Sequence, residues 1–297
     1  MERILFGDNQ FFGINHMSDD QARNMAQRFQ TNDAVLSLID EVQNLGIRVF
    51  MCTTHERVSQ IADSFRANPQ KYRQLQIYPC MPYAHKYANA VSESGIVEAV
   101  RKFLPSEAPL MSLLKNGVAV ASQDVDYLIR SLVDAEMKAF VNLQTPVIFL
   151  QNVVTDLLLG LGFHESFVTF ADHVRKRHGA EPGFITMNLP RLADALHKVG
   201  LNKPIICANI NKIGFRMCGG VDAYERAIRD GGFTAVAMSV FASGAIPPEE
   251  AIEYVGTQPN IKSIVFGASS ASNVRATKSL IERVSQRCAE LKPSLRG

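Results

Sequence analysis

The sequence predicts an α/β protein folded as a (β/α)8 barrel, the TIM-barrel fold, with residues 1–297 in a single domain. Two observations predict it. Short β-branched or aliphatic runs alternate with amphipathic segments from end to end, which is typical of βα units and a parallel sheet. We count eight such runs, and most are apolar on both faces, as expected of strands buried between a barrel core and surrounding helices.

The elements follow in order along the chain. The predicted strands are Ile4–Phe6, Ile47–Cys52, Leu75–Cys80, Val147–Gln151, Gly183–Asn188, Pro204–Asn209, Thr234–Val240 and Ile261–Phe266. The predicted helices include Asn32–Leu45, a helix from Glu56, Pro190–Val199, Asp222–Asp230, Glu249–Val255 and Ser270–Leu291, each with apolar residues at helical spacing. An open, doubly wound sheet is the alternative, but such sheets usually have fewer strands, and no G-x-G-x-x-G follows the first strand.

One crossover is too long for a simple βα unit. Between Cys80 and Val147 lie 66 residues, about twice the ~30 residues of a βαβ unit. We therefore expect a helical insertion over residues 84–146. After Ser122, one helix face carries Val125, Leu128, Ile129, Leu132, Val133, Met137 and Phe140. The insertion either covers the barrel mouth or packs outside it, where it would form extra packing or a contact between subunits of a homo-oligomer.

Composition excludes several classes of protein. A net charge of +2, spread along the chain, argues against nucleic-acid or membrane-surface binding. The five cysteines lie far apart, which predicts neither disulfides nor a C-x-x-C metal site. The most apolar stretch, Val147–Phe163, is interrupted by polar residues and should not span a membrane. The N-terminal residues lack the apolar core of a signal peptide, so the expected location is the cytoplasm.

Polar residues gather after the predicted strands, where barrel enzymes carry their active sites. We expect Asp8, His16, His55 and His85 to transfer protons, because histidine titrates near neutral pH. The candidates for substrate binding are Asn9, Tyr83, Asn188 and Asn209. Each has a structural alternative: Asp8 and Asn9 as a turn, Thr54 as the cap of the helix at Glu56, and the asparagines as partners of loop backbone. The remaining histidines, His164, His173, His178 and His197, are expected to be solvated on helices.

The last two βα units predict an anion site. Small residues follow both strands, and each loop opens a helix whose N-terminal N–H groups favour negative charge. The candidate residues are Gly244, Gly267, Ser269 and Ser270. The pattern resembles metabolic barrels in which a Ser-Gly-Gly-Ile-type loop and a Val-Gly-Ser-type loop hold phosphate, although Ala245 replaces the second glycine here. The alternative is that the glycines only permit tight turns.

The end of the chain also resembles the aldo-keto reductases. Ser263-Ile-Val-Phe-Gly-Ala-Ser-Ser-Ala-Ser-Asn273 is similar to their last strand and helix, which hold the phosphate of NADP, and Pro247–Val255 matches in kind. The whole chain resembles an uncharacterised set of barrels near that superfamily, through Phe6–His16 and Thr155–Gly162. The resemblance implies the fold and allows NADP. However, Met51–Glu56 lacks the catalytic Asp and Tyr that those reductases carry there.

Four functions follow from these patterns. We favour a lyase or isomerase of aldolase-like chemistry acting on a small anionic or phosphorylated metabolite, with Lys212 as a possible Schiff-base lysine just after the sixth strand. The second is an NADP-dependent oxidoreductase. The third is a metal-dependent hydrolase with His16, His55 and His85 as ligands, although no His-x-His marks the first strand. The fourth is a barrel that binds without catalysis.

Overall fold

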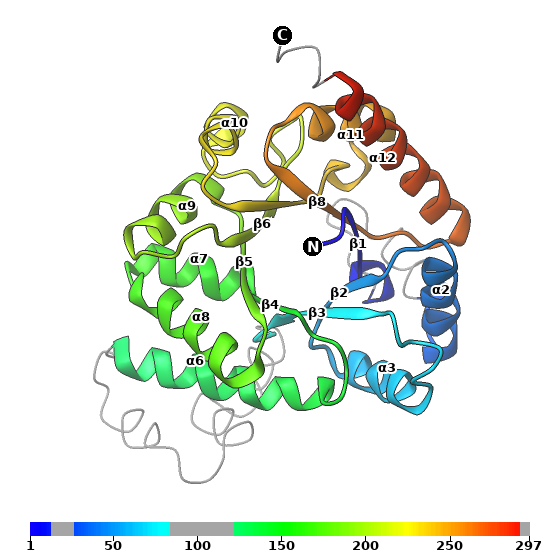
Figure 1. Ribbon diagram of the computed structural model, residues 1–297, viewed down its shortest axis with the longest axis horizontal. Coiled ribbons are helices and arrows are strands. Elements are labelled where there is room, and N and C mark those ends of the chain that lie inside the picture. The colour runs from blue at the N-terminus through cyan, green and yellow to red at the C-terminus, as the bar shows by residue number, and fades with distance from the viewer. Residues whose placement is uncertain (13–26, 84–121, 292–297) are drawn as a thin grey trace.

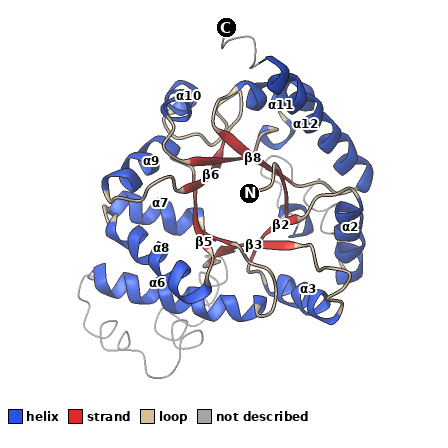
Figure 2. Cartoon of the chain, viewed as in Figure 1, coloured by secondary structure: helices blue, strands red, loops and turns tan. Residues whose placement is uncertain are grey.

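The predicted barrel is confirmed by the computed structural model, which describes residues 1–12, 27–83 and 122–291. Eight parallel strands form a closed barrel in chain order, and β8 pairs back to β1. Figures 1 and 2 show the strands as an inner ring and the helices as an outer ring. The strands are β1 (Ile4–Gly7), β2 (Val49–Thr53), β3 (Gln76–Met81), β4 (Val147–Leu150), β5 (Glu181–Thr186), β6 (Ile205–Asn209), β7 (Thr234–Met238) and β8 (Ile261–Phe266).

The inside of the barrel is a packed apolar core. Neighbouring residues point to opposite faces of each strand, so Leu5 and Phe149 join the inner cluster while Phe6 and Ile148 pack toward the helices. Gly183 of β5 leaves space for the Phe149 ring, since a Cβ there would lie 2.4 Å from it. Because side chains fill the interior, a substrate can be held only at an end of the barrel.

The helices pack outside the strands and follow the apolar periodicity of the sequence. Buried residues of the second helix, such as Val35, Leu38 and Ile39, share one face, and the Thr31 side chain accepts from the Ala34 backbone N–H at its start. The α-helices are α2 (Asn32–Asn44), α3 (Glu56–Ala67), α6 (Ser122–Met137), α7 (Asn152–Leu161), α8 (Glu165–His178), α9 (Leu189–Lys198), α10 (Gly220–Asp230), α11 (Pro248–Thr257) and α12 (Ala271–Leu291), and the short 3-10 helices are η1 (Asn9–Phe12), η2 (Lys138–Phe140) and η3 (Ala242–Gly244).

His55, rather than Thr54, caps the helix after β2. The residue before α3 is His55, whose Nδ1 accepts from the Arg57 backbone N–H at 3.1 Å. Thr54, for which capping this helix was the structural alternative, donates its hydroxyl to the buried Glu136 carboxylate. Glu136 comes from a distant helix and gives the Thr54 hydroxyl a charged acceptor.

The long crossover contributes a helix to the outer layer. Its described part contains α6 and η2, and α6 packs beside α8 (Figure 1). Ile129, Val133 and Phe140 of the predicted apolar face are buried. The rest of the predicted insertion, residues 84–121, lies outside the described residues, so its role as a lid or an interface stays a prediction.

The five cysteines form no disulfide, as the sequence predicts. Cys52, Cys80 and Cys207 are buried in or beside the barrel, where desolvation raises the pKa of each thiol. In the described part of the chain, no helix combines the length and the apolar character needed to cross a bilayer.

Candidate active site

Asp8 lies directly after β1, at the carboxyl-end mouth of the barrel, and is 4% exposed. Its Oδ2 accepts two hydrogen bonds of 2.7 Å, from the backbone N–H and the hydroxyl of Thr53 at the end of β2. Burial raises the pKa of Asp8 to about 6, although the Thr53 hydrogen bonds act in the opposite direction. The site therefore holds a carboxylate that changes charge close to neutral pH.

Tyr83 lies near enough to Asp8 to feel its charge, and His55 contacts Tyr83 and Phe12. The imidazole stacks on Phe12, with ring centroids 4.3 Å apart, and meets Tyr83 edge-on at 6.0 Å. Burial and the charge of Arg57 lower the pKa of His55, so its neutral form prevails at pH 7. Since Nδ1 accepts from Arg57, the neutral ring carries its proton on Nε2. Burial and the nearby Asp8 charge raise the pKa of Tyr83, so this phenol stays protonated.

Glu136 of α6 joins the loops that carry these groups. It is 4% exposed, accepts from the Thr54 hydroxyl after β2, and accepts the Tyr83 backbone N–H after β3 at 3.1 and 3.2 Å. Glu136 was not among the site residues predicted from the sequence. The sequence pattern could have identified it, because Glu136 is a carboxylate within the apolar face of a helix, between the buried Val133 and Phe140.

The asparagines after β6 hold their own loop. Asn209 donates to the Arg216 carbonyl at 3.0 Å, and Asn211 bonds both the N–H and the carbonyl of Phe215. These bonds support the structural alternative for Asn209, a candidate for substrate binding. Asn188 precedes α9 without a side-chain cap bond, and Asn9 is exposed in η1. A substrate contact at Asn9, Asn188 or Asn209 stays a prediction.

The ends of β7 and β8 contain turns and hydroxyl groups. Ser239, Ala242, Ser243 and Gly244 have positive φ angles of 52°, 45°, 58° and 94°, so the backbone after β7 is repeatedly left-handed. Such conformations cost non-glycine residues about 1–3 kcal/mol each and often occur at functional sites. The Gly244 N–H is already bonded to the Phe241 carbonyl.

The loop after β8 leads into α12. Ser270 Oγ accepts from the Asn273 backbone N–H at 3.3 Å and lies 3.0 Å from Ser272 Oγ, so Ser270 caps this helix. Ser269 precedes it and is half-buried. Gly267 has a packing role, because a Cβ there would lie 2.0 Å from the side-chain oxygen of the buried Gln10.

Lys212 lies at the surface. Its ammonium group is paired with Glu250 Oε1 at 2.6 Å, and the two side chains are 51% and 44% exposed. The other two mouth histidines predicted from the sequence, His16 and His85, lie outside the described residues. The structure therefore brings together Asp8, His55 and Tyr83 from three successive strand ends, and it describes only one of the three histidines proposed as metal ligands.

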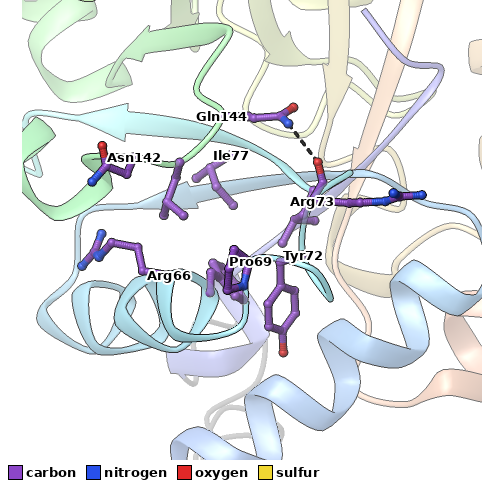
Figure 3. A pocket seen from close by; sticks show the side chains of 10 residues that line it. Arg66, Pro69, Tyr72, Arg73, Ile77, Asn142 and Gln144 are labelled. Atoms are coloured by element: carbon purple, nitrogen blue, oxygen red, sulfur yellow. Dashed lines mark hydrogen bonds between the residues drawn. The ribbon is translucent and has the colours of Figure 1, made fainter.

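A cavity of about 250 Å³ opens elsewhere (Figure 3). Its lining includes Arg66 of α3, Ile77 near the start of β3 and Gln144, whose side chain donates to the Arg73 carbonyl at 2.8 Å. It therefore lies toward the amino end of the strands, opposite the mouth. That end of a (β/α)8 barrel contributes to stability rather than to chemistry.

Comparison with known proteins identifies the fold of this chain but no sequence family to which it belongs. No family model matches the chain, and no curated protein matches it in sequence. A Pseudomonas aeruginosa protein assigned to the aldo-keto reductases superposes with a TM-score of 0.59 at 12% identity, over 95% of this chain and 89% of that one.

Other solved barrels are similar at the same level. An aldo-keto reductase from Bacillus halodurans, in its holo form, gives a TM-score of 0.51 at 10% identity, over 97% of this chain and 91% of that one. Orotidine 5'-monophosphate decarboxylase from Methanocaldococcus jannaschii gives 0.51 at 9% identity, over 95% and 99%. Barrels with such different reactions share only the architecture with this chain, which is a (β/α)8 barrel.

Proposed function

We propose that this protein is an enzyme that transfers a proton on a small anionic metabolite, in a lyase or isomerase reaction at the barrel mouth. The observation that carries the proposal is the buried carboxylate of Asp8, held at a strand end with a pKa of about 6. A base is most effective when its pKa lies close to the working pH. Asp8 meets this condition, since it is ionised at neutral pH and more basic than an exposed aspartate.

The hydrogen bonds of Asp8 suit a general base. The two hydrogen bonds from Thr53 engage Oδ2, and the Asp8 backbone N–H also acts on the carboxylate. We assign Oδ1, which Thr53 does not contact, to the substrate proton. The two bonds fix the carboxylate, so little reorganisation is needed when the proton moves. Oδ1 takes a proton from a carbon next to a carbonyl group, and the electron pair of that C–H bond moves toward the carbonyl oxygen.

His55 supplies the complementary group. A neutral imidazole that carries its proton on Nε2 donates a hydrogen bond to the developing oxyanion without first becoming charged. The Arg57 backbone N–H fixes this tautomer, and Phe12 and Tyr83 restrict the ring. We assign Asp8 as the base and His55 as the donor to the carbonyl oxygen. His16 and His85 remain proposed for a second proton transfer.

The substrate anion is proposed to bind after β7 and β8. The serine hydroxyls at the start of α12 support this, because hydroxyl donors and a helix N-terminus favour an anion. The left-handed turn ending at Gly244 supports it less, since the N–H groups of Ala242 and Gly244 are bonded within the turn. Gly267 supports it less, since Gln10 fills the space beside it. Lys212 is not part of the proposed mechanism, because a Schiff-base lysine must reach the substrate as a free amine, whereas Lys212 is paired with Glu250.

The test follows exchange of a C–H proton, which needs no knowledge of the full reaction. A panel of small phosphorylated and carboxylated carbonyl compounds is incubated with the full chain in D2O, and loss of each C–H signal is followed by NMR. We expect exchange for at least one compound, and a decrease of about 10²–10⁴-fold in Asp8→Asn, the usual contribution of a positioned base. Exchange that survives this substitution, or none with any compound, would contradict the proposal.

The control variant is Asp156→Asn. The Asp156 carboxylate has the same kind of partners as Asp8, since it accepts a threonine hydroxyl and a backbone N–H, from Thr186 and Met187. However, it stands on α7 in the helical layer. We expect this variant to exchange at the wild-type rate, which separates loss of a base from loss of a buried carboxylate.

A second candidate, an NADP-dependent oxidoreductase, is favoured by the serines before α12, since the reductase-like segment would place the cofactor phosphate there. The Ser270 hydroxyl is suited to bind the cofactor phosphate. The Gln10 side chain, however, leaves little space beside Gly267 for that phosphate. NADP would supply a hydride. Titration of NADPH fluorescence tests this candidate: binding that weakens about tenfold in Ser270→Ala would support it, and unchanged fluorescence would exclude it.

A further inference from the structure

Two histidines and one aspartate meet between α6 and α8, outside the barrel. Asp134 lies in the second half of α6, and His173 and His178 lie near the end of α8, which packs beside it (Figure 1). The Nε2 atoms of both histidines are 2.8 Å from the same oxygen, Asp134 Oδ1. The rings are nearly perpendicular, at 78°, with centroids 5.6 Å apart.

The cluster is shielded from solvent, contrary to the sequence-based expectation that these histidines are solvated. The His173 and His178 side chains are 15% and 14% exposed, and that of Asp134 is 39% exposed. Solvent therefore reaches the cluster mainly from the aspartate side. Both ring nitrogens that face Asp134 are therefore held together in one partly enclosed space between α6 and α8.

We propose that Asp134, His173 and His178 form a binding site for a divalent transition-metal ion of the zinc class. Two imidazoles and a carboxylate are a donor set that Zn²⁺ prefers, with water as a fourth ligand on the exposed side. Within residues 1–12, 27–83 and 122–291, three such donor atoms from separate side chains lie within 4.8 Å of one another only here. That spacing admits one ion with bonds of ~2.0–2.2 Å after a small outward movement of the carboxylate.

The proton balance is simple. Each neutral imidazole that now donates through Nε2 moves its proton to Nδ1, and the Nε2 lone pair then binds the metal. Asp134 is already a carboxylate and loses no proton. Binding to neutral histidines therefore releases no proton to solvent.

The site would connect two parts of the molecule. Asp134 lies two residues before Glu136, which holds the loops after β2 and β3 through Thr54 and Tyr83. A metal bound to Asp134 would fix α6 against α8 and so steady the helix from which Glu136 reaches the barrel mouth. We therefore assign the ion a structural role, independent of the reaction proposed at Asp8.

The test uses the full chain after removal of metal with a chelator. Titration with Zn²⁺ followed by calorimetry should show one equivalent bound, and Co²⁺ should give the visible absorption of a tetrahedral site with nitrogen and oxygen ligands. In His173→Gln and His178→Gln, an amide N–H still reaches Asp134 but the imidazole lone pair is lost. We expect each to weaken Zn²⁺ binding more than about 100-fold, since loss of a ligand should exceed the 10–100-fold of outer contacts.

The matched control is His197→Gln, which removes an exposed histidine on α9 and should leave affinity unchanged. If a glutamine variant fails to fold, Asp134→Asn retains an acceptor for both histidines and should fold with weakened Zn²⁺ binding. Wild-type protein that binds no Zn²⁺, affinity unchanged in all three cluster variants, or a Co²⁺ spectrum with the thiolate band expected from Cys218 would overturn the proposal.

Discussion

The two sides of the barrel mouth are built from different chemistry. The ends of β1 to β3 present Asp8, His55 and Tyr83, whose pKa values are all shifted mainly by burial. The ends of β7 and β8 instead present hydroxyl groups and left-handed backbone, from Ser239 to Ser270. The described residues at the ends of β1 to β3, by contrast, have no positive φ angle.

The difference indicates that the two sides of the mouth have separate roles. Groups that titrate near neutral pH can move protons, whereas fixed N–H and O–H groups can hold an anion without changing charge. One side should therefore determine the rate of proton transfer and the other the affinity for the substrate anion. Substitutions on the two sides should be separable, and their effects on stability should differ in size.

The largest expected effect on stability comes from Asp8→Asn. A pKa of about 6 in the folded state against 3.8 for the free side chain means that the folded protein retains a proton that the unfolded chain has lost. The stability that this proton gives is present below pH 4 and is lost as the pH rises through about 6. At pH 8 the variant should exceed wild type by about 3 kcal/mol in free energy of unfolding, at 1.36 kcal/mol per unit of pKa.

Urea denaturation at pH 4 and pH 8 measures this effect. The two proteins should be nearly equal at pH 4 and separate as the pH rises. Asp156→Asn is the matched control, because burial also raises the pKa of Asp156, although its side chain is only half-buried. The free energy of unfolding of Asp156→Asn at pH 8 should also exceed that of wild type, but by less than in Asp8→Asn. An Asp8→Asn variant less stable than wild type at pH 8 would mean that burial does not destabilise the ionised carboxylate.

Glu136→Gln should have the next largest effect, in the opposite direction. In wild type, the Thr54 hydroxyl and the Tyr83 N–H both donate to carboxylate oxygens of Glu136. In the variant, one of these oxygens becomes an amide NH2 group, which is a donor and cannot accept either bond. We expect a loss of about 1–3 kcal/mol in free energy of unfolding, the cost of leaving a buried donor unsatisfied. Denaturation measures it. Tyrosine fluorescence should report a change near Tyr83, since the chain has no tryptophan. Unchanged stability would show that Glu136 does not hold the two loops.

Ser270→Ala tests the anion side. Loss of the cap on α12 should cost about 1 kcal/mol in free energy of unfolding. If the hydroxyl also binds the substrate anion, KM should rise several-fold for a phosphorylated compound and remain unchanged for its dephosphorylated analogue. Ser279→Ala is the control, since Ser279 is an exposed serine further along the same helix. Equal KM changes for both compounds would remove Ser270 from the anion site.

Lys212→Ala should have the smallest effect. Its ion pair with Glu250 is about half-exposed, and such pairs contribute about 0–1 kcal/mol. We expect no change in the rate of C–H exchange. Borohydride should trap no adduct between the wild-type protein and a carbonyl compound that undergoes exchange. A trapped adduct that disappears in this variant would restore Lys212 as a Schiff-base residue.

The fold was predictable because its determinants are local. Runs such as Ile205–Asn209 are apolar on both faces, and the helices between them repeat their apolar residues at helical spacing. The convergence of Asp8, His55 and Tyr83 followed from one rule, that parallel strands in a closed barrel end at the same mouth.

The partners of these residues were not predictable, because they come from distant segments. Glu136 reaches Thr54 across 82 positions, and Asp134 is 39 and 44 positions from its two histidines. Seen from α8 alone, His173 and His178 are polar residues near the end of a helix. Only packing against α6 buries them and turns both rings toward one oxygen.

The pKa of Asp8 tests the central claim most directly, and it needs no substrate. The carboxyl carbon of Asp8 in ¹³C-labelled protein, assigned by comparison with Asp8→Asn, is followed by NMR as the pH changes. Titration at about 6 is expected if burial at the barrel mouth outweighs the hydrogen bonds from Thr53. A pKa at or below 3.8 would show that the carboxylate is stabilised as the anion, and Asp8 would not be the base proposed here.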